Sequence, residues 1–166
     1  MSEKIEFTDR KISREDLDRI LEAGILTPTA KSLQPQKIYV IESEKKLDII
    51  QKITNYKSPT ILLVCGDEEK CYKKNNSVSY KQDCILVSLN MVLEATYLGI
   101  DNLYMETYNF LNKLEKEFSL NVNNMPVSLI FLGYKKEASV GFKASDFNCN
   151  LLPKREKNIN EIVKYI

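Results

Sequence analysis

Hydrophobic and polar positions follow a helical period near the start of the chain. The apolar positions of residues 17–25 recur three or four apart, as on one face of an amphipathic helix. Ser13 can cap this helix at its beginning, with Asp16 as a weaker capping-box partner. Pro28 disfavours helical backbone at the residue before it. The pattern therefore predicts a first helix that ends before Pro28.

The pattern then alternates between strands and helices. β-Branched and aromatic residues predict a strand over residues 37–42, and continuous apolar runs predict buried strands over 59–65 and 127–132. Amphipathic spacing predicts helices over 44–53 and 110–120. Strands that alternate with helices favour a sheet that is covered by helices.

Residues 83–99 carry apolar side chains around most of the circumference of a helix. A helix of this kind is buried on all sides. A chain of 166 residues can hardly bury it alone, so we expect one face to contact a second copy in a homodimer. The whole chain, residues 1–166, is expected to be one domain, with 141–166 an extended tail that wraps the partner subunit.

Composition narrows the classes of function. With 24 basic and 23 acidic residues the net charge is +1, so no global field favours nucleic acid or a membrane surface. The absence of histidine excludes histidine-based triads, metal sites and general bases. None of the four cysteines forms a Cys-x-x-Cys pair, so no metal site is predicted. The longest apolar run, residues 84–100, is too short to span a bilayer. We expect a soluble cytoplasmic protein.

Two polar segments are candidates for binding. The link Thr27-Pro-Thr-Ala-Lys-Ser-Leu-Gln-Pro-Gln36 is longer than the usual connection of about 2–6 residues, and it can hold hydroxyl and amide groups over a ligand. Residues 66–80 contain several lysines, but no stacking aromatics interleave with a longer basic stripe, which favours a solvated loop over a nucleic-acid site. No glycine-rich phosphate loop is present. Lys154 and Arg155 are candidates for a phosphate site or a solvated surface pair.

Several segments, taken in order, resemble those of the FMN-dependent nitroreductase family. The link 27–36 resembles the family's Ala-Pro-Ser-x-x-Asn-x-Gln-Pro-Trp signature. The other segments are 7–13 (approach to the first helix), 83–99 (central dimer helix), 99–107 (segment under the isoalloxazine), 125–134 (late strand) and 146–155 (phosphate-binding tail). No single motif is specific, but the ordered set is fairly specific to the family.

The resemblance implies a fold and an activity. The fold would be α+β, a three-layer α/β/α sandwich with a helix-covered mixed sheet and a long central helix at a dimer interface. The cofactor would be FMN, which performs the redox step, so that no protein side chain needs to act as nucleophile. NAD(P)H would reduce the flavin, and small planar acceptors such as nitroaromatics, quinones or enones would reoxidise it in a ping-pong mechanism.

The resemblance also implies cofactor-binding residues. Four residues of the link, Thr29, Ala30, Ser32 and Gln34, fall in the loop that contacts the partner subunit's flavin. Glu106 and the backbone N–H of Thr107 would lie near flavin N5, and Lys154 and Arg155 would bind the FMN phosphate.

The start of the chain departs from the family pattern. Members usually begin with Arg-Arg-Ser-x-Arg-x-Phe, and alignment on Phe7 places Ile5 where an arginine is expected. Lys4 and Ser2 are the candidate replacements for the basic residue and the serine. Two alternatives therefore stay open: a non-catalytic flavin- or ligand-binding relic of the family, and a dimeric α/β scaffold whose loop binds a protein partner.

Overall fold

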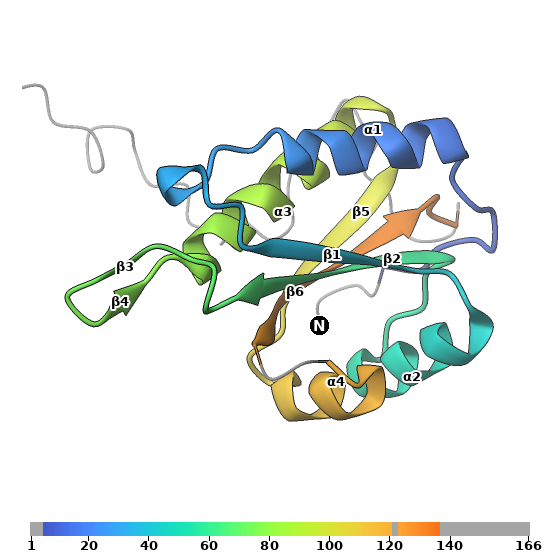
Figure 1. Ribbon diagram of the computed structural model, residues 1–166. Coiled ribbons are helices and arrows are strands. Elements are labelled where there is room, and N and C mark those ends of the chain that lie inside the picture. Colours follow the sequence, from blue (N-terminus) through green and yellow to red (C-terminus); the bar gives the residue numbers. More distant parts are fainter. Residues whose placement is uncertain (1–4, 121–122, 137–166) are drawn as a thin grey trace, which may run out of the picture.

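A four-stranded antiparallel sheet forms the middle of the molecule (Figure 1). The computed structural model describes residues 5–120 and 123–136. The strands lie side by side in the order β1 (Gln36–Ile41), β2 (Thr60–Asp67), β6 (Asn124–Gly133) and β5 (Asp101–Glu106). All three pairings are antiparallel. The three strand predictions are thereby confirmed.

The prediction of a mixed sheet is wrong for the described residues, which contain no parallel pair. Helical connections commonly cross a sheet and link parallel strands. Here the connections from β1 to β2 and from β5 to β6 return to the end of the sheet that they left. The connection from β2 to β5 does cross the sheet, but β6 lies between these two strands. Ile41 at the end of β1 pairs with Ile61 near the start of β2, and Glu106 at the end of β5 pairs with Ser128 of β6.

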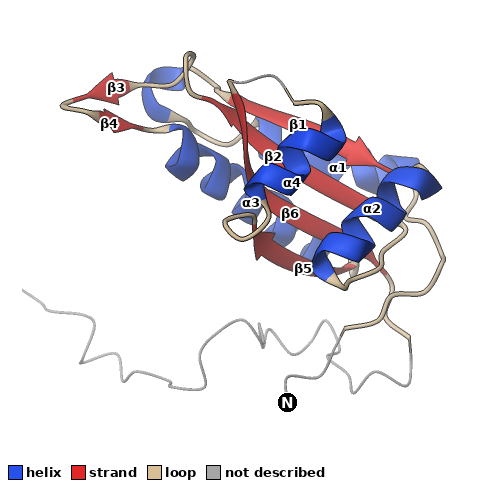
Figure 2. Cartoon of the chain, turned by 90° about the horizontal axis from the view of Figure 1, so that it is seen from below, coloured by secondary structure: helices blue, strands red, loops and turns tan. Residues whose placement is uncertain are grey.

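Two helices cover each face of the sheet (Figure 2). Helices α1 (Arg14–Ile25) and α3 (Tyr80–Tyr97) pack on one face, and α2 (Glu44–Thr54) and α4 (Leu111–Phe118) pack on the other. The expected three-layer α/β/α sandwich is therefore confirmed. None of the helices among the described residues combines the length and the apolar character needed to cross a membrane.

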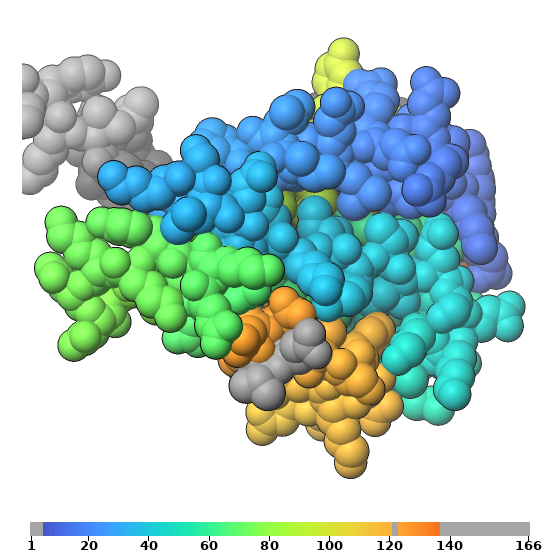
Figure 3. Space-filling view, viewed as in Figure 1, coloured from blue at the N-terminus to red at the C-terminus, as the bar shows by residue number. Residues whose placement is uncertain are grey.

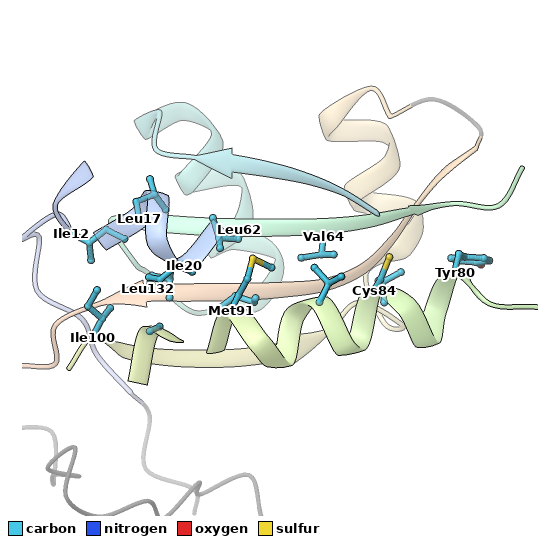
Figure 4. Close-up of a cluster of buried hydrophobic side chains, with 14 of the residues drawn as sticks. Ile12, Leu17, Ile20, Leu62, Val64, Tyr80, Cys84, Met91, Ile100 and Leu132 are labelled. Carbon is cyan, nitrogen blue, oxygen red and sulfur yellow. The ribbon is translucent and has the colours of Figure 1, made fainter. Parts of the chain in front are cut away.

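Side chains of β2 alternate between two apolar cores, as the strand period requires. Leu62 and Val64 face α1 and α3, whereas Ile61 and Leu63 face α2 and α4. Figure 4 shows the first core, in which Met91 of α3 packs with the strand residues. Because both faces are covered, seven of the eight β2 residues are buried.

The first helix begins and ends as the sequence predicts. The Ser13 hydroxyl oxygen accepts the N–H of Asp16 at 3.0 Å, which is the expected N-cap. Near its end α1 crosses α3 closely at Gly24, where a Cβ atom would lie 2.8 Å from the Cγ of Met91. The small residue therefore sets how near the two helices approach.

The described residues bury helix α3 on one side only. Met91 and Ala95 face the core, but Leu86, Leu89 and Leu93 are 48%, 48% and 42% exposed. The predicted helix is confirmed, but its exposed row has no cover among the described residues, so the expected burial on all sides is not seen there.

Two elements were not predicted. Strand β5 was missed because its first two residues, Asp101 and Asn102, are polar and interrupt the apolar pattern. Residues 66–80, expected to be a loop, contain a short antiparallel hairpin of β3 (Lys73–Lys74) and β4 (Ser77–Val78). The predicted tail, residues 141–166, lies outside the described residues.

Candidate functional site

The loop between α1 and β1 adopts a strained backbone conformation. A short 3-10 turn, η1 (Ala30–Ser32), forms its middle. Lys31, Ser32 and Gln34 have φ angles of 55°, 55° and 47°, which is the left-handed region. Non-glycine residues rarely occupy this region, and such strain is concentrated at functional sites. Three strained residues in one short loop require contacts that hold them.

Some of these contacts lie within the loop itself. The N–H of Gln34 donates to the hydroxyl oxygen of Thr29 at 3.0 Å, and the Gln34 side-chain amide donates to the carbonyl oxygen of Ile25 at 3.3 Å. Gln34 therefore closes the turn onto Thr29 and connects it to Ile25 at the end of α1. The hydroxyl of Thr29 is held in place by this bond.

Helix α3 supplies further contacts from its inner side. The N–H of Ala30 donates to the Asp83 carboxylate at 2.9 Å, and the Asn90 amide donates to the Thr27 hydroxyl oxygen at 2.8 Å. In Figure 3 the segment around Lys31 also lies beside the β3–β4 hairpin. The Lys31 ammonium is 6.0 Å from the centroid of the Tyr72 ring. The loop is thus docked against the N-terminal part of α3.

The second group of predicted residues lies where β5 ends. Glu106 is exposed and Thr107 is 1% exposed. The N–H of Thr107 donates to the carbonyl oxygen of Val127 at 3.1 Å, and its hydroxyl donates to the carbonyl oxygen of Pro126 at 2.8 Å. The Thr107 N–H is therefore already used inside the protein, although the sequence interpretation placed it near flavin N5.

The donor that β5 leaves open at this end is the N–H of Glu106. Along an antiparallel strand, successive N–H groups point alternately toward the partner strand and away from it. Because the N–H of Thr107 points to β6, that of Glu106 points to the opposite side. β5 is an edge strand of the described sheet, so this side is its open edge.

A small cavity of about 40 Å³ lies next to this strand end. Tyr80 and Lys81 of α3 form one wall, and Glu106, Thr107 and Tyr108 form another. The same first turn of α3 carries Asp83, which holds the loop at Ala30. The two groups of predicted residues therefore both lie near the N-terminal end of α3. The cavity alone is far too small for a flavin.

Burial keeps the nearby thiols and phenols neutral. It raises the pKa of the Cys65 and Cys84 thiols from 9.0 to about 12. It likewise raises the pKa of Tyr104 to about 12, with the Glu106 charge as a smaller cause, and it raises the pKa of Tyr80. None of these four groups ionises near neutral pH. The described residues contain no group of three or more acidic, Cys or His side chains arranged to hold a metal ion.

The structure brings together six of the ten predicted cofactor-binding residues in two groups, four in the loop and two at the end of β5. Ser2, Lys4, Lys154 and Arg155 lie outside the described residues. Asp83 and Asn90, which hold the loop, were missed. Their signal is visible in the sequence as two polar residues seven positions apart, and so on one face, in a helix that is apolar around most of its circumference.

Comparisons with known proteins agree with this geometry. The model of the nitroreductase family matches residues 1–59. A protein of Archaeoglobus fulgidus, with the provisional name NADH dehydrogenase/NAD(P)H nitroreductase, is 26% identical over 148 residues that cover 84% of each chain.

Solved structures share the fold over nearly the whole chain. A nitroreductase family protein of Clostridium difficile 630 is 27% identical, with a TM-score of 0.83 over 98% of this chain and 92% of that one. A Desulfovibrio desulfuricans protein with the provisional name nitroreductase, solved in complex with FMN, has the same fold at 22% identity and a TM-score of 0.76, over 99% of this chain and 91% of that one. Together with the fold and the family model, these likenesses show that the chain is similar to the nitroreductase family in sequence and in structure.

Proposed function

We propose that this protein is an FMN-dependent oxidoreductase that uses NAD(P)H to reduce small planar acceptors such as nitroaromatics, quinones or enones. Similarity to the nitroreductase family supports the oxidoreductase class, and the FMN complex of the Desulfovibrio desulfuricans protein, which has the same fold, supports the choice of flavin. The observation that carries the proposal is the open N–H of Glu106. It lies close to the N-terminal end of α3, against which the strained loop of residues 27–36 is docked.

The described groups fit a flavin in their chemistry. The ring system of FMN has oxygen and nitrogen acceptors along one edge, and a backbone N–H at the open edge of a sheet is a fixed donor for one of them. The loop adds the Thr29 and Ser32 hydroxyls and the Gln34 amide. FMN, when bound, would supply electron transfer between NAD(P)H and the acceptor, and the residues of this chain would orient it and limit access of water.

A second copy of the chain would complete the site. Leu86, Leu89 and Leu93 form an exposed apolar row on α3, and Leu26, 74% exposed, directly precedes Thr27, which contacts Asn90 of the same helix. A contiguous exposed apolar surface of this kind marks an interaction site. We propose that two copies pair through it, so that the loop of one copy reaches the flavin bound at β5 of the other.

The phosphate of FMN would be bound outside the described residues. On the resemblance of residues 146–155, we propose Lys154 and Arg155 for this role, with Ser2 and Lys4 in place of the family's N-terminal serine and arginine. A hydrogen bond between charged groups contributes about 1.5–3 kcal/mol. The double variant Lys154→Ala/Arg155→Ala should therefore weaken FMN binding by at least about tenfold.

Absorbance spectroscopy tests the proposal. The purified protein, loaded with FMN, should be yellow and should show the absorbance band of oxidised flavin. NADH or NADPH, added without oxygen, should bleach this band. FMN binding without bleaching would favour the alternative of a ligand-binding relic. A protein that takes up no FMN would contradict both flavin hypotheses.

A further inference from the structure

We infer that Asp83 and Asn90 are positioning residues, which hold the strained loop of residues 27–36 in the shape that the flavin site needs. The inference rests on the proposed function, because it assigns to these residues an effect on FMN affinity through the loop. Neither side chain needs to touch the cofactor for this role.

The loop cannot hold its shape by backbone preference. Lys31, Ser32 and Gln34 all have positive φ angles, and none of them is glycine. Each such residue prefers another conformation when it is free to choose. The bonds of Gln34 fix one side of the turn, and the N–H of Asp67 in β2 holds the end of the loop at the carbonyl oxygen of Pro35 at 2.8 Å. Side chains of α3 restrain the beginning of the loop.

Asp83 provides the first restraint. Its side chain is 4% exposed, and its two carboxylate oxygens accept from different segments. One oxygen accepts the N–H of Ala30 at 2.9 Å, and the other accepts the hydroxyl of Ser79 at 2.7 Å. Ser79 in turn exchanges hydrogen bonds with the backbone of Tyr72 at the base of the hairpin. One buried carboxylate thereby joins the loop to the beginning of α3 and to the hairpin.

Asn90 provides the second restraint two helical turns further along the same face of α3. Its amide donates to the Thr27 hydroxyl oxygen at 2.8 Å, and that hydroxyl donates to the carbonyl oxygen of Ala23 at 3.1 Å. The two restraints therefore hold the loop at Thr27 and Ala30, on either side of Pro28. The strained residues begin directly after the second of them.

Hydrogen exchange of peptides that cover residues 27–36, measured beside the FMN dissociation constant, tests the inference. Asp83→Ala removes a charged acceptor. It should raise both the exchange rate of the loop amides and the FMN dissociation constant about 10- to 100-fold, because one hydrogen bond to a charged group is lost. Asp83→Asn keeps an acceptor for Ala30 and should restore most of the affinity. Asp67→Ala is the matched control, because its carboxylate accepts two backbone N–H groups of another loop.

A second pair of variants keeps the test decisive if Asp83→Ala does not fold. Thr27→Val removes the contact with Asn90 from the loop side. Thr96→Val is its control, because the Thr96 hydroxyl makes the same two kinds of hydrogen bond as that of Thr27. It donates to the carbonyl oxygen of Val92, four residues earlier, and it accepts the Asn102 amide at 3.0 Å. Thr27→Val should raise loop exchange about 2- to 10-fold and weaken FMN binding, and Thr96→Val should do neither.

Unchanged loop exchange in Asp83→Ala and Thr27→Val would overturn the inference. Faster exchange with unchanged FMN affinity would overturn it as well, since the loop shape would then not matter to the site. Failure of the proposed function is distinguishable, because it shows in the unmodified protein as absence of FMN binding. Failure of this inference shows only in the variants.

Discussion

The backbone N–H of Thr107 donates to the carbonyl oxygen of Val127 at 3.1 Å. This bond continues the pairing of β5 with β6 by one residue beyond Glu106 and Ser128. It removes the Thr107 N–H from the donors that a ligand can use. It also fixes the N–H of Glu106 toward the open edge of the sheet. The candidate flavin contact therefore shifts by one residue from the position that the sequence indicated.

Proline at position 106 tests which N–H is used. Proline lacks an N–H, and it is tolerated in an edge strand where the N–H faces away from the partner strand. Glu106→Pro should keep the fold and weaken FMN binding about 5- to 100-fold, because it leaves a buried flavin acceptor without its donor. Thr107→Pro removes a ladder bond, so it should lower the free energy of unfolding more than Glu106→Pro does. Urea unfolding and FMN titration measure the two effects.

Glu106→Ala is the control for this experiment, because it keeps the backbone N–H and removes only the carboxylate. Its FMN affinity should stay within about threefold of the unmodified protein, since no donor is lost. Equal FMN affinity of Glu106→Pro and Glu106→Ala would show that the N–H of Glu106 does not bind the cofactor.

A charge in the exposed row of α3 should separate the proposed dimer. Leu89 is 48% exposed, and a glutamate there would have to be buried without a partner in the interface. Light scattering should give about twice the 19.2 kDa of one chain for the unmodified protein and the mass of a single chain for Leu89→Glu. Val40→Glu, at another exposed apolar residue, should leave the mass unchanged. A single-chain mass for the unmodified protein would contradict the proposed dimer.

Loss of the dimer should also weaken FMN binding. The loop of residues 27–36 is proposed to reach the partner's flavin, so separated copies lose its hydroxyl and amide groups. A Leu89→Glu variant that is monomeric and still binds FMN with full affinity would show that each copy binds its flavin without the partner's loop.

The buried thiols predict a loss of stability in alkaline solution. Burial raises the pKa of Cys84 from 9.0 to about 12, so the folded protein binds this proton more tightly than the unfolded chain does. Its contribution to stability is complete below pH 9 and is lost as the pH rises toward 12, at about 1.4 kcal/mol per pH unit. Urea unfolding should be measured between about pH 8 and about pH 10.5, where the unfolded thiol begins to ionise. The free energy of unfolding should fall more steeply with pH for the unmodified protein than for Cys84→Ala.

The same burial predicts slow alkylation. Iodoacetamide reacts with thiolates, and Cys65 and Cys84 are 0% exposed with a pKa of about 12. Site-resolved mass spectrometry at pH 8 should find both unlabelled in the folded protein and labelled after unfolding. Rapid labelling of either in the folded protein would contradict the described core.

Much of the fold could be predicted from the sequence because its elements have clear periods. The cap at Ser13, the buried strand β2 and the apolar circumference of α3 each depend on local spacing, which the sequence displays directly. The antiparallel order of the sheet could not be predicted, because local spacing does not show that a connecting helix returns to the end of the sheet it left. β5 was hidden by Asp101 and Asn102, whose side chains bond to other segments.

The residues of the candidate site could be proposed from the sequence, but their contacts could not. Thr29, Ser32 and Gln34 were proposed because the loop is polar and resembles a family motif. The left-handed backbone of Lys31, Ser32 and Gln34 is not visible in local spacing. Neither is the hydrogen bond of Ala30 to Asp83, which lies 53 residues further along the chain. The use of the Thr107 N–H depends on the register of β5 against β6, which no single-sequence pattern shows.

The central claim is that this chain binds FMN and passes electrons from NAD(P)H through it. The most direct test is anaerobic absorbance spectroscopy of the FMN-loaded protein during titration with NADH and NADPH, followed by addition of a quinone or nitroaromatic acceptor. We expect the flavin band to disappear with one of the nicotinamides and to return with the acceptor. A protein that fails to retain FMN, or a bound flavin that neither nicotinamide reduces, would contradict it.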